Sequence, residues 1–313
     1  MRILILGGFG FVGGRVARHL SHAGHSIVLG TRHAYGSPEW LPQAEVAHLR
    51  WQDANALERS CRGVDAVIHA AGMSAPDCAA DPVAALEFNG LATARLLAAA
   101  MRAGVQRFLY FSTAHVYASP LAGTITEHTC PRNLHPYATS HLAGEYAVLA
   151  AGQRGLIKGV VLRLSNAFGA PVWKEANCWT LLVNDLCRQA VVTGRLQLHT
   201  AGTQLRDFIT LEDVSRAVLH VLQVEPAGLG DGLFNLGGDA AVSVLTMTEQ
   251  VAARWKALTG GALPIIRPQP SGALPEPLDY SCGKLKASGF SLTSQGEQEI
   301  DATLRLCRVS FGT

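Results

Sequence analysis

The sequence predicts an α/β protein built on a doubly wound parallel sheet, followed by a second, smaller α+β lobe. In the first half of the chain, short apolar runs alternate with longer amphipathic runs, beginning with the apolar residues 2–6 and 26–30. Strands that alternate with helices in this way form parallel sheets. The chain has 313 residues, 48% of them hydrophobic, which is enough for one large core with a smaller lobe.

The first strand and the first helix are joined by a glycine-rich turn. Residues 2–6 are an apolar run that ends in glycine, as buried parallel strands do. The turn consists of Gly7, Gly8, Phe9, Gly10, Phe11, Val12 and Gly13. Gly7 and Gly10 allow a tight turn and a close approach of pyrophosphate, and Gly13 lets the helix lie against the strand. Phe11 and Val12 begin a helix whose free N–H groups suit phosphate, so the turn predicts a Rossmann-type dinucleotide site.

The end of the second strand, residues 26–30, indicates which dinucleotide to expect. NAD-binding sheets normally carry a carboxylate there for the adenosine ribose. In this chain the strand ends in Gly30, Thr31, Arg32 and His33. Because a guanidinium can pair with a 2′-phosphate, Arg32 beside Thr31 favours NADP. NAD is the alternative, in which Arg32 is a solvated turn residue.

Three further strands are expected to complete the first sheet, at residues 46–49, 64–69 and 106–111. The small residues Ala70 and Ala71 follow the fourth strand and would let a cofactor lie against the strand end. A helix is expected around residues 82–101, and the fifth strand leads directly into Ser112 and Thr113.

The composition narrows the function classes. The net charge is +2 without a basic run, which argues against a nucleic-acid or membrane partner. No apolar segment is expected to reach spanning length, and the chain does not open like a signal peptide. Seven cysteines are scattered without a C-x-x-C pair, so we expect reduced thiols in a cytoplasmic protein and no metal site.

Seven motifs along nearly the whole chain resemble the extended short-chain dehydrogenase/reductases. This branch holds nucleotide-sugar epimerases, dehydratases and ketoreductases. The motifs are the glycine turn and residues 68–71, 112–117, 136–145, 163–169, 206–214 and 234–238. The resemblance implies hydride transfer with NAD(P). It also implies that Asp53 contacts the adenine and that Asn89 is structural.

The resemblance assigns the reacting residues. Tyr137 would exchange a proton with the substrate oxygen, and Thr113 would hydrogen-bond that oxygen. His141 stands where the family has a lysine that holds the nicotinamide ribose and lowers the pKa of the tyrosine. Tyr137 and His141, at i and i+4, share one helix face. The first of the five lysines is Lys158, so no lysine lies near Tyr137 in sequence.

The replacement of lysine by His141 leaves three outcomes open. An imidazole can hydrogen-bond a ribose hydroxyl, but it is mostly neutral at pH 7 because its reference pKa is about 6.5. The enzyme would then be slower or have a more acidic pH optimum; or Tyr137 would act only as an acid towards a ketone; or the protein would bind NADP without turnover. The retained Thr113 and Tyr137 favour an active enzyme.

His115 is the second unusual residue of the site. At its position the 4,6-dehydratases carry a glutamate, within a triplet that here reads Thr113-Ala114-His115. The loss of both acidic residues argues against 4,6-dehydration. His115 either moves a proton at a sugar carbon or oxygen, or it only lines the pocket or bonds a backbone carbonyl, and the sequence favours neither.

The second half is expected to bind the substrate. By resemblance Asn166 and Arg206 contact a diphosphate, although Arg206 could instead form a structural ion pair with Asp207. Trp173 or Trp179 would stack on a sugar ring. The predicted elements are a strand at 156–164, a loop at 171–177, an extended stretch at 263–277 and helices at 178–190, 211–224, 246–258, 279–288 and 293–307.

The predicted division places the dinucleotide domain at residues 1–168, with 208–236 returning to it, and a mainly substrate-binding lobe at 169–313. Small residues after Tyr137 suggest a homodimer through this helix, unless they face the protein's own sheet. They are Ala143, Ala147, Ala150 and Ala151. The expected function is NADP-dependent reduction of a keto group on a nucleotide-linked sugar. The alternatives are a nucleotide-sugar epimerase and a non-catalytic NADP-binding regulator.

Overall fold

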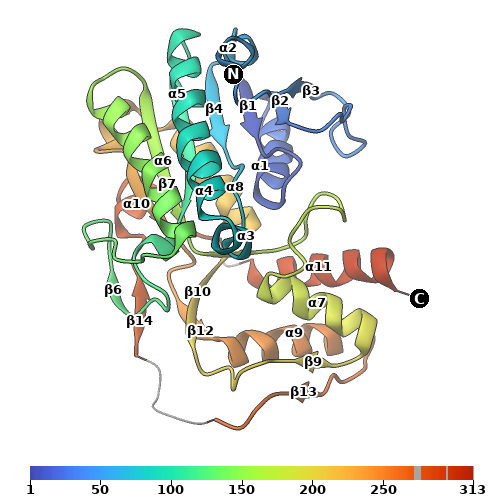
Figure 1. Ribbon diagram of the computed structural model, residues 1–313. Coiled ribbons are helices and arrows are strands. Elements are labelled where there is room, and N and C mark those ends of the chain that lie inside the picture. The colour runs from blue at the N-terminus through green and yellow to red at the C-terminus, as the bar shows by residue number, and fades with distance from the viewer. Residues whose placement is uncertain (271–275, 294, 313) are drawn as a thin grey trace.

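A seven-stranded sheet lies at the centre of the protein (Figure 1). The structure is a computed structural model that describes residues 1–270, 276–293 and 295–312. The strand order is β11-β7-β5-β4-β1-β2-β3, and every neighbouring pair is parallel. The chain starts at β1 and builds the sheet first in one direction and then in the other, so the predicted doubly wound α/β fold is confirmed.

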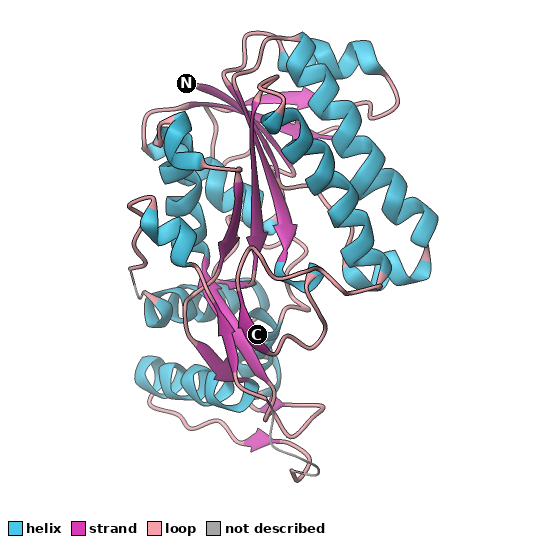
Figure 2. Ribbon diagram, turned by 90° about the vertical axis from the view of Figure 1, so that its left-hand side faces the viewer, coloured by secondary structure: helices cyan, strands magenta, loops and turns pink. Residues whose placement is uncertain are grey.

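The strands and the helices around them follow the predicted alternation. The strands of this sheet are β1 (Arg2–Leu6), β2 (Ser26–Thr31), β3 (Glu45–His48), β4 (Ala66–His69), β5 (Arg107–Thr113), β7 (Lys158–Leu164) and β11 (Leu233–Leu236). The helices are α1 (Phe11–His22) and α8 (Leu211–Gln223) on one face and α2 (Ala54–Cys61), α5 (Ala92–Arg102) and α6 (Pro136–Gln153) on the other. Figure 2 shows the strands running between these two helical layers.

The two sides of β1 explain why both layers are needed. Ile3 and Ile5 belong to the core under α1 and α8, whereas Leu4 and Leu6 belong to the core under α2, α5 and α6. All four side chains are fully buried. A strand that alternates its side chains between two covered faces must be apolar throughout, as residues 3–6 are.

Strand β5 is longer than predicted and carries Ser112 and Thr113 within it. The two residues pair with Arg163 and Leu164 on β7. They are therefore strand residues at the carboxyl edge of the sheet, and the predicted end at residue 111 is wrong. The parallel partner strand β7 continues to Leu164 and provides the hydrogen bonds that extend β5.

The helix predicted at residues 82–101 is present but irregular. It consists of α4 (Pro82–Ala85), a π-helical turn η1 (Leu86–Leu91) and α5, and α3 (Ala75–Ala80) precedes it. By length and composition alone, the 21-residue helix Pro82–Arg102 is long and apolar enough to cross a membrane, so the expectation that no segment reaches this length is wrong. Half of the 18-residue window that meets this criterion is buried inside the protein, as in the core helix of a globular domain.

A second lobe lies below the sheet in Figure 1, built on α7, α9 and α11. Its helices are α7 (Leu182–Thr193), α9 (Val244–Thr259) and α11 (Gly296–Phe311). Its three-stranded sheet is formed by β8 (Asn166–Phe168), β10 (Leu205–Thr210) and β12 (Ala241–Ser243). The short pairs are β9 (Leu196–Gln197) with β13 (Ile265–Ile266), and β6 (Gly123–Ile125) with β14 (Leu278–Tyr280). The remaining helices are α10 (Gly283–Ala287) and the 3-10 turns η2 (Ala114–Val116) and η3 (Pro226–Leu229).

Three predicted elements in this half need correction. The helix expected at 279–288 begins as strand β14, because residues 278–280 pair with β6, and only 283–287 are helical. Helix α7 begins at Leu182, four residues later than expected, and α11 begins at Gly296. The extended stretch predicted at 263–277 lies partly outside the described residues.

The chain returns to the first lobe after the second has begun. Helix α8 packs on the core beside α1, and β11 joins the main sheet next to β7. A buried ion pair also ties the lobes together, because Arg15 of α1 donates to Glu299 of α11 over 3.0 Å and to the carbonyl of Ala170 over 3.0 Å. The predicted boundary at residue 168 stays a prediction.

Candidate active site

A cleft of about 600 Å³ opens at the carboxyl edge of β1, β2 and β4. The strand order reverses between β1 and β4, and ligands of doubly wound sheets bind at such a switch point. Most of the predicted cofactor residues line this cleft. They are Gly7, Gly10, Phe11, Val12, Thr31, Arg32, Ala70, Ala71, Tyr137 and His141.

The glycine turn can only be made by glycine at two positions. Gly7 has a φ of +74°, and a Cβ added to it would stand 2.8 Å from the carbonyl oxygen of Ala70. A Cβ on Gly13 would stand 2.2 Å from the carbonyl oxygen of Gly7. Helix α1 starts at Phe11, and its N-cap Gly10 offers no side chain to its first N–H groups. The turn therefore presents close backbone and free N–H groups to the cleft, as pyrophosphate binding requires.

Trp173 lies against the glycine turn. Its indole N–H donates to the carbonyl of Phe9 over 2.6 Å, and its ring packs edge-on against Phe9 and Tyr35 at 5.7 Å from each. Trp173 comes from the loop after β8, so a residue of the second lobe covers the end of the cleft that the glycine turn forms. Its predicted stacking on a sugar stays a prediction, and no local pattern indicated its contact with Phe9. Trp179 instead donates to the carbonyl of Lys174 over 2.7 Å.

Arg32 stands at the rim of the cleft. Its side chain is exposed, and its guanidinium carbon lies 5.8 Å from the ring centre of Phe88. The ring of Phe88 meets Trp51 edge-on at 5.5 Å, and both aromatics line the cleft. Sequence reasoning missed Trp51 and Phe88. Trp51 could have been predicted, because it closely follows the end of β3 and so lies at the carboxyl edge of the sheet.

Asp53 caps a helix in this structure. Its carboxylate accepts a hydrogen bond from the backbone N–H of Ala56 over 2.9 Å and caps the N-terminus of α2. Asp53 is not among the residues that line the cleft. The predicted adenine contact stays a prediction, and the helix cap is sufficient reason for a carboxylate here.

Tyr137 lies at the start of α6, facing the cleft. The N-cap of α6 is His135, whose Nδ1 accepts from the backbone N–H of Tyr137 over 3.1 Å. Thr113 lies nearby at the end of β5 and is 4% exposed. Withdrawal of the Tyr137 hydroxyl from bulk water raises its pKa, and the side chain of Thr113 offsets part of this rise. Tyr137 is therefore a neutral phenol near pH 7, with a proton to donate.

His141 is buried behind Tyr137 and is only 5% exposed. Its Nδ1 lies 2.9 Å from the hydroxyl of Tyr110. Its Nε2 has no hydrogen-bond partner among the described residues. Burial lowers the pKa of His141 to about 4, so the imidazole is neutral at pH 7. It therefore cannot lower the pKa of Tyr137 as a lysine would.

Asn89 occupies the π-helical turn and holds several segments together. Its side chain accepts from the N–H of Met73 over 2.9 Å and donates to Ser140 Oγ over 3.0 Å. These bonds join the strand end after β4 to α6. The structural role expected for Asn89 matches this arrangement.

Arg206 lies close enough to His115 for its positive charge to affect the imidazole. Burial and then the charge of Arg206 lower the pKa of His115, and His115 Nδ1 has no hydrogen-bond partner among the described residues. Burial also lowers the pKa of Arg206. Among the described residues Arg206 forms no ion pair with Asp207, whose Oδ1 accepts from the N–H of Gly238 over 2.8 Å. The alternative of a structural Arg206–Asp207 pair is not what the structure shows.

Asn166 uses its amide within the second lobe. Its Nδ2 donates to the carbonyl of Asp207 over 2.8 Å, which links β8 to β10. Neither Asn166, Arg206 nor His115 lines the described cleft. The predicted contact of Asn166 with a diphosphate stays a prediction.

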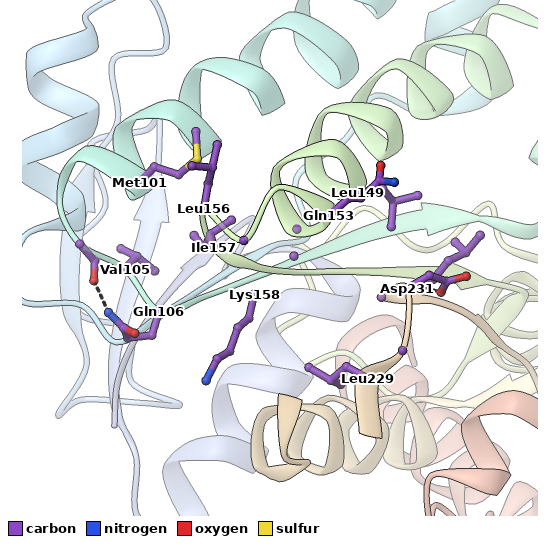
Figure 3. Close-up of a pocket in the computed structure, with 17 residues that line it drawn as sticks. Met101, Val105, Gln106, Leu149, Gln153, Leu156, Ile157, Lys158, Leu229 and Asp231 are labelled. Carbon is purple, nitrogen blue, oxygen red and sulfur yellow. Dashed lines mark hydrogen bonds between the residues drawn. The ribbon is translucent and has the colours of Figure 1, made fainter. Parts of the chain in front are cut away.

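A second hollow, of about 740 Å³, lies at the opposite edge of the sheet (Figure 3). Its polar groups do not converge, because Lys158 and Asp231 point away from each other, Asp231 pairs with Lys284, and Gln106 donates to the carbonyl of Gly104. Tyr137, His141 and most of the predicted cofactor residues line the smaller cleft, although Thr113 does not, so we place the site there. Across the described ranges, no group of three or more His, Cys, Asp or Glu side chains could hold a metal ion.

The comparisons with known proteins show to which family the chain belongs. The sequence model of the NAD dependent epimerase/dehydratase family matches residues 3–237. The chain belongs to this family. It is 31% identical over 260 residues to the UDP-glucose 4-epimerase of Azospirillum brasilense, covering 78% of this chain and 74% of that protein. The chain is therefore an enzyme of the extended short-chain dehydrogenase/reductase type.

Two solved structures show the same fold. The UDP-glucose 4-epimerase of Thermus thermophilus in complex with NAD superposes with a TM-score of 0.81 and 25% identity, covering 99% of this chain and 100% of that one. RMD from Pseudomonas aeruginosa, complexed with NADPH, superposes with a TM-score of 0.76 and 23% identity, covering 99% of both chains. The second likeness, at this identity, shows the fold alone.

Proposed function

We propose that this enzyme is an NADP-dependent reductase that reduces a keto group of a nucleotide-linked sugar. The observation that carries the proposal is the contact between Tyr137 and the buried His141, whose ring centroids are 4.6 Å apart. The pKa of Tyr137 is raised, and the neighbouring His141 is neutral. A neutral phenol can give a proton to the oxygen of a ketone but is a poor base towards an alcohol.

The residues then take the following tasks. NADPH, when bound, supplies the hydride. Tyr137 donates its proton to the carbonyl oxygen as the alcohol forms, and the hydroxyl of Thr113 hydrogen-bonds the same oxygen and orients it. His141 would hold a ribose hydroxyl through Nε2, because its other ring nitrogen is bonded to Tyr110 and Nε2 has no partner among the described residues.

Arg32 supports the choice of NADP over NAD. It is exposed at the rim of the cleft, and the described residues show no ion pair that occupies its guanidinium. A 2′-phosphate would be bound bidentately there, with Phe88 and Trp51 beside it.

Arg206 supports a substrate that carries a diphosphate. Its guanidinium is withdrawn from water and lacks a carboxylate partner in the described part of the chain. A buried cation of this kind is stabilised by an anionic ligand. The relatives named above act, by their names, on UDP-glucose, which supports a nucleotide-linked sugar as the substrate class.

The second candidate is a nucleotide-sugar 4-epimerase, favoured by the names of these relatives. An epimerase must first oxidise a sugar hydroxyl and would need Tyr137 as a base. His115, whose Nδ1 is unpartnered among the described residues, would be its best additional base. The third candidate, a non-catalytic NADP-binding regulator, is supported only by the neutral His141.

Three assays on one preparation distinguish these candidates. Steady oxidation of NADPH with a 4-keto nucleotide sugar supports the reductase. Interconversion of UDP-glucose and UDP-galactose without net cofactor change supports the epimerase and would overturn the reductase. Tight NADPH binding without turnover on either substrate supports the regulator. Mass spectrometry of the nucleotide retained after purification identifies the cofactor independently.

The proposal includes a homodimer in the cytoplasm. The helices α4, η1 and α6 present exposed apolar side chains on one side of the protein. They are Val83, Leu86, Leu91 and Tyr146, between 45% and 68% exposed. Such a patch suits a self-complementary contact, and sedimentation of a Leu86→Asp variant tests it. The seven free cysteines support a reducing compartment.

A further inference from the structure

We propose that Tyr110 is a positioning residue that fixes His141 in the tautomer with its proton on Nε2, so that the buried imidazole donates a hydrogen bond into the cleft. The inference deepens the proposed function and rests on it in one respect, since the acceptor is taken to be a hydroxyl of the bound pyridine nucleotide. The tautomer itself rests only on the protein.

The first step is the contact between the two side chains. Tyr110 lies on β5 and is fully buried, and His141 lies on α6 at 5% exposure. The phenol oxygen and His141 Nδ1 are 2.9 Å apart, and the ring planes meet at 32° with centroids 5.9 Å apart. The distance is that of a well-formed hydrogen bond, which leaves open only which atom is the donor.

The surroundings decide the donor. Burial raises the pKa of Tyr110 well above its ordinary value, so the phenol keeps its proton. The carbonyl of Asn89 is 3.4 Å from it, a poor distance, and already accepts from Thr93 Oγ1 over 2.6 Å. Thr93 Oγ1 in turn lies 3.0 Å from His69 Nε2. The hydroxyl of Thr93 also approaches Tyr110, but it donates its own proton to Asn89. His141 Nδ1, at 2.9 Å, is therefore the best-placed acceptor for the Tyr110 proton.

The tautomer of His141 follows from this assignment. Burial keeps the ring neutral, and a neutral imidazole carries one proton. Because Nδ1 accepts from Tyr110, that proton is on Nε2. This nitrogen lies 3.7 Å from the point where a Cβ on Gly72 would stand, and both Gly72 and His141 line the cleft.

With its tautomer fixed, His141 can replace a lysine in one function, the donation of a hydrogen bond into the cleft. A lysine always presents donors, whereas an unfixed histidine presents a donor or an acceptor. Tyr110 removes this ambiguity for His141. The Tyr110→Phe variant leaves Nδ1 without a donor, so the proton can move to Nδ1 and the nitrogen facing the cleft becomes an acceptor.

The first test reads the tautomer without any cofactor. Histidine labelled with ¹⁵N gives different imidazole shifts for the two neutral tautomers, and His141→Asn identifies the signals of His141. We expect the wild-type protein near pH 7 to show Nε2 protonated, and Tyr110→Phe to lose that pattern. Protonation of Nδ1 in the wild-type protein overturns the proposal, whether or not the variant folds.

The second test is a binding cycle with NADPH. We expect Tyr110→Phe to weaken binding about tenfold with the wild-type His141, and to have little effect on a His141→Lys protein. The control is Tyr117→Phe, which removes another buried phenol hydroxyl, bonded to Asn235 over 2.8 Å. We expect it to leave NADPH binding unchanged.

The two tests separate this inference from the proposed function. If the wild-type protein shows the Nε2 tautomer but binds no pyridine nucleotide, the proposed function fails and the tautomer stands. If the protein binds NADPH and Tyr110→Phe alters neither the ¹⁵N shifts nor the affinity, the positioning role of Tyr110 is refuted while the proposed function stands.

Discussion

The ring of His141 lies edge-on to the ring of Tyr137, with 4.6 Å between their centroids and 72° between their planes. An uncharged ring thus occupies the position beside Tyr137 where the family resemblance leads us to expect a cation. Because the imidazole has a pKa of about 4, it adds no positive charge near pH 7. The reaction direction and its pH dependence should therefore follow from Tyr137 acting as a neutral acid.

A His141→Lys variant should change the direction that Tyr137 favours. A lysine charge beside the phenol lowers its pKa, and each unit raises the tyrosinate fraction about tenfold. We expect higher activity at neutral pH, with the larger gain in the alcohol-oxidising direction, and a pH–rate profile shifted to lower pH. An unchanged turnover, with the wild-type protein already fast, would show that no charge is missed at this position.

An Arg32→Ala variant should lose its preference for NADPH. Loss of a charge-assisted pair with the 2′-phosphate should weaken NADPH binding roughly 10- to 100-fold and leave NADH binding nearly unchanged. Titration calorimetry with both cofactors measures this. Arg59→Ala, on the exposed surface of α2, is the matched control. Equal loss for the two cofactors would refute a role for Arg32 in reading the phosphate.

A Trp173→Phe variant should release the cofactor faster. The change keeps a ring near Phe9 and Tyr35 but removes the hydrogen bond to the carbonyl of Phe9, so the dissociation rate should rise about fivefold. Trp179→Phe removes a comparable bond, to Lys174, and serves as the control. Stopped-flow displacement of NADPH compares them, and equal rates for both variants would contradict a covering role for Trp173.

The stability of the protein should fall in mild acid because two histidines are buried neutral. Burial, and then the charge of His141, lower the pKa of His69 to about 3, and that of His141 is about 4. The unfolded chain, with histidine pKa values of about 6.5, therefore binds more protons below that pH. The free energy of unfolding is then greatest above about pH 6.5 and is lost as the pH falls towards 4 and 3.

Asp207 opposes this trend, since burial raises its pKa to about 6 and protonation in the folded state recovers stability below that pH. At pH 5 the two histidines remove roughly 4 kcal/mol and Asp207 restores roughly 1 kcal/mol. Urea unfolding at pH 5 and pH 7 measures the difference. The double variant His69→Gln with His141→Asn should flatten the dependence, and a slope equal to that of the wild-type protein would contradict the assignment.

Local patterns predicted the fold and the cofactor turn well. The glycine turn follows directly after β1, so its spacing alone shows that strand, turn and helix belong together. The i and i+4 spacing of Tyr137 and His141 likewise predicts that they share a face of α6. These features depend on neighbours in sequence, which is why they could be read without the structure.

Contacts between distant segments could not be read in the same way. Tyr110 on β5 contacts His141 on α6. Trp173 contacts Phe9, which lies 164 residues earlier in the chain. The composition of these segments does not indicate which residues they contact. The strand β14 was likewise mistaken for helix because residues 278–280 gain their extended form from pairing with β6, not from their own pattern.

The most direct test of the account is the oxidation of NADPH by the purified enzyme with a 4-keto nucleotide sugar, compared with Tyr137→Phe. We expect steady oxidation near pH 7, a loss of roughly 100-fold or more in kcat for Tyr137→Phe, and much slower oxidation of the corresponding alcohol sugar with NADP. Rapid interconversion of UDP-glucose and UDP-galactose with retained NAD, and no net oxidation of NADPH, would contradict it.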